Sequence, residues 1–155
     1  MEIEKKYLIS TLPFKLAQYP FEEIEQGYLC KNPVVRVRKK GGHYILTYKS
    51  REGVEKVEKL CVANEVEVPL TMESYEHLRD KADGNLITKT RYKIPYDSTH
   101  TIELDIFKGK HKGLILAEVE FASLEEVEHF IPPTWFGEDV SGNPCYSNSF
   151  LSTID

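Results

Sequence analysis

The chain has 155 residues, of which 41% are hydrophobic and 29% are charged, and its formal net charge is −5. This length and composition fit one folded domain, residues 1–155, and exclude a disordered chain or one with an apolar run of about 18 residues that could span a membrane. The acidic balance gives no sign of a nucleic-acid-binding surface, so any anion site must be a local concentration of cations.

Most of the chain has the pattern of β-strands, because segments rich in Val, Ile, Leu, Tyr and Thr are separated by short turns. In chain order the predicted strands are residues 2–9, 25–30, 34–40, 43–50, 54–69 with a break near Ala63-Asn64, 86–94, 99–107 and 114–121. Gly41-Gly42 between two of these segments is a typical hairpin turn. About eight strands joined by short turns predict a mainly β (α+β) fold, with one antiparallel sheet closed into a barrel.

Short helices are expected beside the barrel. Residues 71–81 carry apolar side chains at helical spacing, and Ser123-Leu124-Glu125-Glu126 is a capping box whose helix stops at Pro132-Pro133. Shorter helices are predicted within residues 12–19 and after Pro144. The aromatic residues that follow the capping box are expected to dock the C-terminal segment on the barrel; they are Phe130, Trp135 and Phe136.

The charges within the predicted strands are sorted by sign. Residues two apart in a strand share a face, so Arg36-Val37-Arg38 places two cations on one face and Glu118-Val119-Glu120 places two carboxylates on one face. A solvated outer face explains any one of these pairs. Because like charges on one face repel, the sorting over several strands instead favours a charged ligand lying between them. With the apolar faces turned outward, the barrel would have a charged lumen, the inverse of a usual small barrel.

The lumen would then contain both signs of charge. Its cations would be Lys6, Arg36, Arg38, Lys49, Lys89 and Arg91, and its acids Glu2, Glu4, Glu65, Glu67, Glu103, Asp105, Glu118 and Glu120. One interpretation is mutual neutralisation, since isolated buried charges are costly. The other is that the carboxylates hold divalent metals while the cations hold a polyanion. Oxygen ligands without nearby His or Cys favour Mg²⁺ or Mn²⁺ over zinc.

Compartment is indicated by the start of the chain and by its cysteines. Residues 2–6 are mostly charged, unlike a signal peptide. The three cysteines are odd in number, far apart and without a CxxC motif, which is typical of idle thiols in a reducing cytosol; they are Cys30, Cys61 and Cys145. A cytoplasmic protein is expected.

The ordered motifs resemble those of the CYTH domain proteins, the triphosphate tunnel metalloenzymes, and in particular their short bacterial members. Glu2-Ile3-Glu4-Lys5-Lys6 is similar to the ExExK signature of that family. The similarity continues in order over nearly the whole chain, through Gln26-Gly27-Tyr28-Leu29, Arg36-Val37-Arg38, Lys49, Glu65-Val66-Glu67, Lys89-Thr90-Arg91, Glu103-Leu104-Asp105 and Glu118-Val119-Glu120.

The resemblance implies an eight-stranded antiparallel tunnel that hydrolyses triphosphates with Mg²⁺ or Mn²⁺ in a two-metal site. By position, Glu118 and Glu120 would hold the metal that bridges the triphosphate, and Glu2 and Glu4, with Glu120, a second metal that positions water. Asp105 is a further expected metal ligand, and Glu65 and Glu67 would support the acidic side. The expected triphosphate-binding residues are Lys6, Arg36, Arg38, Lys49, Lys89 and Arg91.

The resemblance leaves several substrates open. An inorganic tripolyphosphatase is the leading hypothesis, and the alternatives are an adenylate cyclase of the same family or a thiamine, nucleoside or RNA 5′-triphosphatase. A non-catalytic polyphosphate or nucleotide-binding protein is the remote alternative, and the presence of Glu2 and Glu4 argues against it. The expected partner is a small polyphosphate or nucleoside triphosphate, with neither membrane nor nucleic acid, and a homodimer is left open.

Overall fold

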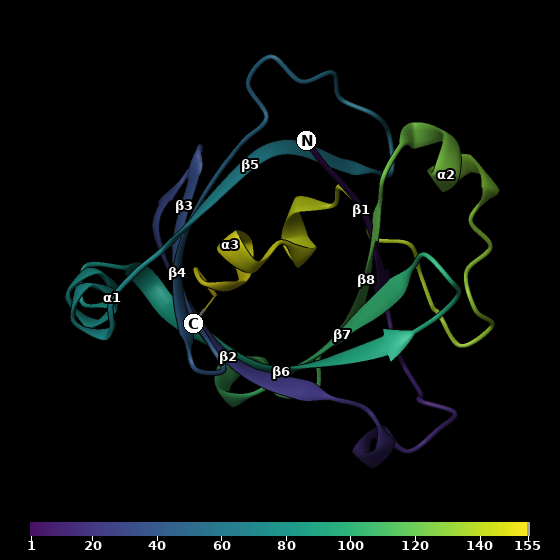
Figure 1. The fold of residues 1–155 in the computed structure, drawn as a ribbon, viewed down its shortest axis with the longest axis horizontal. Helices are drawn as coiled ribbons and strands as arrows, with labels where there is room; N and C mark the ends of the chain where they lie inside the picture. The colour runs from purple at the N-terminus through teal and green to yellow at the C-terminus, as the bar shows by residue number, and fades with distance from the viewer. Residues whose placement is uncertain (155) are drawn as a thin grey trace.

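The computed structural model describes residues 1–154, in which eight antiparallel strands form a closed barrel (Figure 1). The strands are β1 (Glu2–Leu8), β2 (Phe21–Lys31), β3 (Val34–Lys40), β4 (His43–Ser50), β5 (Cys61–Pro69), β6 (Asp83–Pro95), β7 (Thr101–Phe107) and β8 (Ile115–Phe121). Around the barrel their order is β1-β5-β4-β3-β2-β6-β7-β8, and β1 closes the ring by pairing with both β5 and β8. The predicted fold class is confirmed.

The predicted turn between β3 and β4 is present. Lys40 pairs with His43, so Gly41 and Gly42 form a two-residue connection. Gly41 has a φ of 57°, in the left-handed region that a residue without a Cβ adopts at little cost. The register of this hairpin places Arg36 opposite Thr47 and Arg38 opposite Ile45.

The main apolar core lies on the outer side of the barrel wall, as the charge pattern predicted. Along β8 the odd-numbered residues Ala117, Val119 and Phe121 are buried among apolar neighbours, whereas Glu118 and Glu120 line the interior. The connecting segments complete this core from outside, and the docking predicted for three aromatics is confirmed. The covering side chains include Leu12, Phe14, Leu16, Val54, Val57, Phe130, Trp135 and Phe136.

Short helices flank the wall. They are the 3₁₀ turns η1 (Leu16–Gln18), η2 (Gly109–His111) and η3 (Pro144–Tyr146) and the helices α1 (Met72–Arg79), α2 (Leu124–His129) and α3 (Asn148–Leu151). Ser123 caps α2 as predicted, by accepting from Glu126 N, although the Glu126 carboxylate accepts from Ala122 N and not from Ser123 N. Thr71 caps α1, which the sequence did not predict. In Figure 1, α1 and α2 lie outside the ring of strands, whereas α3 lies within it.

The strand predicted at residues 54–69 is wrong in its first half. Residues 54–60 form an irregular connection and β5 begins at Cys61, not at a break near residue 63. Val54, Val57 and Leu60 are spaced by three and all pack on the outer core, which a strand of period two could not achieve. Lys59 has a φ of 54°, which also ends extended pairing.

A small apolar cluster closes one end of the lumen, which the sequence did not predict. Ile87, Phe107 and Leu116 occupy inward-facing positions of β6, β7 and β8. They pack against Val140 and Leu151. The last of these belongs to α3, so the C-terminal segment crosses the barrel and covers this end. The charged part of the lumen is therefore closed at one end by this apolar cluster.

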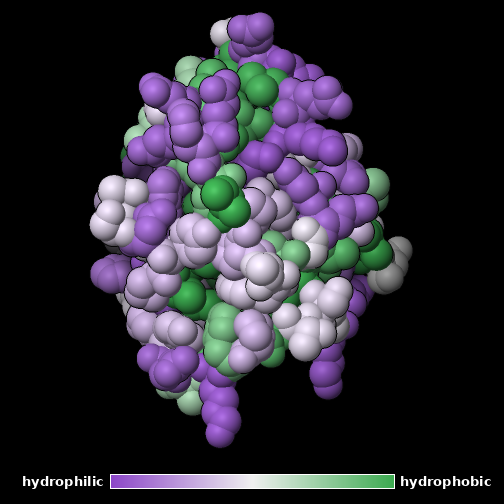
Figure 2. Space-filling model, turned by 90° about the vertical axis from the view of Figure 1, so that its right-hand side faces the viewer, coloured by the Kyte–Doolittle hydropathy of each residue, from purple (hydrophilic) through white to green (hydrophobic). Residues whose placement is uncertain are grey.

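On the side that carries α2, Figure 2 shows mostly polar surface, with apolar residues in small separate groups. No helix within residues 1–154 is long and apolar enough to cross a membrane.

Candidate active site

A cavity of about 720 Å³ occupies the barrel interior, and its wall contains nearly all of the predicted site residues. They are Glu2, Glu4, Lys6, Arg36, Arg38, Lys49, Glu65, Glu67, Lys89, Arg91, Glu103, Glu118 and Glu120. The alternation of strands explains this gathering, because every second residue of each strand faces the lumen. Strand register then sets the neighbours, with Glu4 opposite Glu120 and Lys6 opposite Glu118.

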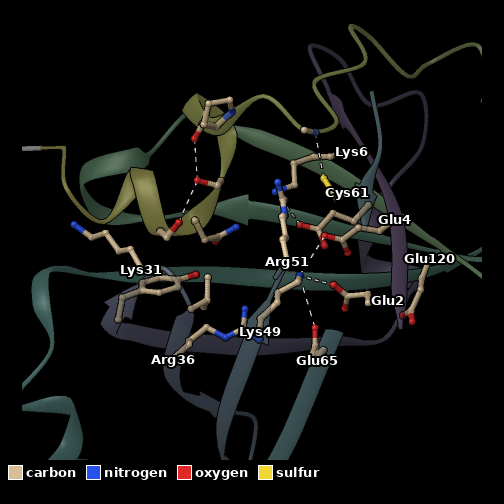
Figure 3. A pocket seen from close by; sticks show the side chains of 18 of the residues that line it. Glu2, Glu4, Lys6, Lys31, Arg36, Lys49, Arg51, Cys61, Glu65 and Glu120 are labelled. Carbon is tan, nitrogen blue, oxygen red and sulfur yellow. Dashed lines mark hydrogen bonds and ion pairs between the residues drawn. The ribbon is translucent and has the colours of Figure 1, made fainter. Parts of the chain in front are cut away.

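The acidic side of the cavity is formed by β1, β5 and β8. The Lys49 Nζ atom lies between three carboxylates: it contacts Glu2 and is 3.8 Å from Glu4 and 3.7 Å from Glu65 (Figure 3). Burial opposes the charge of Lys49, but Glu4 and Glu2 outweigh it and raise the pKa of the ammonium. One lysine faces three acids, so carboxyl groups outnumber cations in this region.

Burial and neighbouring acids both shift the pKa values of these carboxyl groups. Burial, followed by the charge of Glu118, raises the pKa of Glu4 to about 8. Burial likewise raises the pKa of Glu2 and of Glu120, and neighbouring acids add to both. Glu118 differs, because Lys6 and Arg91 outweigh the effect of burial and lower its pKa to about 2.

The basic side begins at a fully buried ion cluster around Asp105. This carboxylate accepts from Lys89 Nζ at 2.7 Å and from Arg91 Nε and Nη2 at 2.7 and 2.9 Å. Asp105 is 0% exposed and lies behind the cavity wall. Its predicted metal role stays a prediction, while the geometry makes it the residue that orients two lumen cations.

We expect Asp105→Asn to destabilise the protein by about 3–5 kcal/mol, because it leaves the buried Lys89 without a carboxylate partner and weakens the pairing of Arg91, which keeps only Glu103 at 3.3 Å and Glu118 at 3.7 Å. The free energy of unfolding in urea measures this. Asp80→Asn is the matched control: its carboxylate is exposed, lies 3.8 Å from Arg79 Nε, and should change stability by less than about 1 kcal/mol. Equal losses for the two variants would contradict the assignment.

Two arginines on β3 are held differently from the other lumen cations. Within residues 1–154, neither Arg36 nor Arg38 has a carboxylate oxygen within ion-pairing distance. Arg36 Nη2 donates to the Thr47 hydroxyl at 3.2 Å, and Arg38 Nε donates to Gln26 Oε1 at 2.8 Å. Burial, with Arg36 and Arg91 nearby, lowers the pKa of Arg38 to about 9. Positive charge thus remains unneutralised on the side of the lumen that β3 forms.

Residues of the C-terminal segment also enter the lumen. Lys6 Nζ donates to the Tyr146 carbonyl at 3.2 Å, and Lys89 Nζ donates to Asn148 Oδ1 at 3.0 Å. Gln26 Nε2 donates to the same oxygen at 3.1 Å. Sequence reasoning missed Gln26, Thr47 and Asn148 as site residues. Gln26 is two residues from Tyr28 on β2, and Thr47 is two residues from Lys49 on β4. The alternation of the strands therefore predicts that both side chains face inward, and this signal could have identified them.

The donor set fits a hard divalent cation, although the side chains of residues 1–154 contain no preformed cluster of three or more metal-ligating groups. Burial raises the pKa values of Glu2, Glu4 and Glu120, and a bound cation would oppose this by stabilising their charged forms. Such oxygen donors suit Mg²⁺ or Mn²⁺.

Comparison with known proteins agrees with this architecture. An inorganic triphosphatase of Nitrosomonas europaea is 35% identical over 155 residues, covering 97% of this chain and 96% of the relative. One from Acetivibrio thermocellus is 36% identical over 154 residues, covering 97% and 92%. The crystal structure of an inorganic triphosphatase superposes with a TM-score of 0.71 at 32% identity, covering 100% of this chain and 96% of that one. No family model matches the chain.

Fold and cavity together define a closed antiparallel barrel whose interior is charged and whose core lies outside the wall. Sequence identity above 30% over nearly the full length of two relatives also shows the family. The chain belongs to the family of these inorganic triphosphatases.

Proposed function

We propose that this protein hydrolyses inorganic tripolyphosphate in a reaction that depends on Mg²⁺ or Mn²⁺, as a short CYTH-type triphosphate tunnel metalloenzyme. The observation that carries the proposal is the polarity of one cavity, in which surplus carboxylates face arginines that have no acidic partner among the described residues. A triphosphate together with divalent cations complements both sides. Mutual neutralisation, the simpler alternative, accounts for Asp105 with its two cations and for Lys49 with its acids, but not for Arg36 and Arg38.

The polyanion is bound by cations that come from separate strands. Lys6 is on β1, Arg36 and Arg38 on β3, Lys49 on β4, and Lys89 and Arg91 on β6. Such a distribution contacts a chain of phosphoryl groups at several points and orients it along the lumen. Arginine contributes paired N–H donors that match phosphate oxygens, and the partly buried cavity strengthens these contacts.

The carboxylates on the opposite side would hold the metal ions. Glu118 and Glu120 would hold one ion and Glu2 and Glu4, with Glu120, a second, while Glu65 and Glu67 would support the acidic side. When bound, these ions neutralise charge on the phosphoryl oxygens and lower the pKa of water. The protein residues place the terminal phosphoryl group between the acidic and basic sides. Water adds to its phosphorus, the bridging P–O bond breaks, and phosphate and pyrophosphate are released.

The cavity lining favours an inorganic substrate over a nucleotide. Its apolar contributors, such as Tyr28, Val34 and Val140, are few and lie among charged and polar side chains. A purine base gains most of its binding from apolar or aromatic contacts, and this wall provides little continuous surface of that kind. The phosphates therefore supply most of the binding.

We expect kcat/KM to fall in the order tripolyphosphate, ATP, pyrophosphate, because a third phosphoryl group adds contacts whereas a base adds few. Steady-state kinetics with each substrate, under saturating Mg²⁺ and again under Mn²⁺, measures this order, and product analysis separates phosphate release from cyclisation. A tenfold preference for ATP with formation of cyclic AMP and pyrophosphate would replace the proposal by an adenylate cyclase.

A further inference from the structure

The cations of the lumen fall into two groups according to what anchors them. Lys89 and Arg91 are anchored by Asp105, and Lys49 by Glu2 and Glu65, so a carboxylate fixes each position and also cancels its charge. Arg36 and Arg38 are anchored by neutral oxygens. The neutral anchors leave the guanidinium charge available.

Gln26 is a fully formed anchor. It is 0% exposed, and all of its polar groups are used: Oε1 accepts from Arg38, while Nε2 donates to the Tyr28 hydroxyl at 3.1 Å and to Asn148 Oδ1 at 3.1 Å. Arginine has donors only, so the Oε1 atom must face Arg38, which fixes the orientation of the amide. The guanidinium is therefore held at Nε, and its two Nη groups remain available to a ligand.

Thr47 anchors the neighbouring arginine in the same way. It is also 0% exposed, lies directly opposite Arg36 in the β3–β4 ladder, and accepts from Arg36 Nη2. Arg36 and Arg38 are thus each held by a neutral side-chain oxygen.

We propose that Gln26 and Thr47 are positioning residues for the triphosphate: they fix Arg38 and Arg36 in the lumen without neutralising them. This inference rests on the proposed function. A carboxylate at either place would supply the same hydrogen bond but would form an ion pair like that of Asp105 with Arg91. Such a pair would compete with phosphate for the guanidinium.

The test compares Gln26→Glu with Gln26→Met. Glutamate keeps the shape and the acceptor, whereas methionine keeps only the volume. If charge is what matters, Gln26→Glu raises KM for tripolyphosphate by roughly 10-fold or more, with the smaller change in kcat, and Gln26→Met raises it less. A residue needed only for structure gives the reverse order, with glutamate closer to the wild type, and that result would overturn the proposal.

Thr47 gives an independent test should Gln26→Glu fail to fold. Thr47→Val removes the hydroxyl at constant shape and is expected to raise KM several-fold, while Thr47→Ser retains the hydroxyl and restores the wild-type value. Equal KM values for Thr47→Val and the wild type would overturn the inference. Wild-type protein that does not hydrolyse tripolyphosphate would instead contradict the proposed function, so the two failures are distinguishable.

Discussion

Arg38→Ala is expected to lower kcat/KM for tripolyphosphate by about 10- to 150-fold, and Arg36→Ala by a similar factor. The reason is that hydrogen bonds from a partly buried guanidinium to phosphate are worth about 1.5–3 kcal/mol, and each 1.4 kcal/mol is about tenfold. Within residues 1–154 neither arginine pairs with a carboxylate, so its removal should weaken substrate binding rather than break an ion pair. Steady-state kinetics at fixed ionic strength measures it.

Lys110→Ala and Lys112→Ala are the matched controls for these arginines. Both lysines are exposed and lie at the turn before β8, outside the cavity. They act on the substrate only through screened, long-range attraction, so their removal should produce a small effect that disappears as salt is added. An effect as large as that of Arg38→Ala, persisting at high salt, would move the anion site out of the barrel.

Glu120→Gln is expected to lower kcat by about 100-fold or more, a loss comparable to removing one preorganised charge-stabilising group from an active site. Glu120 lies opposite Glu4 in the β1–β8 ladder and is proposed to contribute to both metal positions. The substitution keeps the shape of the side chain, so the unfolding midpoint should change little. Activity assays, with and without EDTA, and calorimetric titration with Mn²⁺ measure the loss.

Glu128→Gln serves as the control for charge removal, because this exposed residue of α2 lies outside the cavity. It should retain wild-type activity and Mn²⁺ affinity. Full hydrolysis of tripolyphosphate by the wild type in excess EDTA would contradict the metal requirement. A Glu120→Gln variant that titrates Mn²⁺ like the wild type would remove Glu120 from the metal site.

The barrel and the gathering of charges could be predicted from the sequence because both depend on the period of two in a strand. Once Arg36 and Arg38 share a face, and Glu118 and Glu120 share another, closure of the sheet brings the two faces together without further information. The clustering of 13 predicted charged residues around one cavity follows from this rule alone.

Other parts of the site depend on contacts that no local period encodes. The entry of α3 into the lumen requires Leu151 to meet Ile87 and Phe107, which are distant in sequence. Asn148 acquires its place only through that packing. Residues 54–60 are rich in Val, Glu and Lys and look extended locally, but tertiary contacts with the outer core override this preference.

The separation of the apolar core from the lumen has an evolutionary consequence. Because successive residues of a strand face opposite sides, a substitution on the inner face of β3 or β8 leaves the packing on the outer face unchanged. A barrel of this kind can change the side chains that face the lumen while keeping its strands and outer core. Descendants of one ancestral barrel can thus acquire different anionic ligands through exchanges confined to alternate positions.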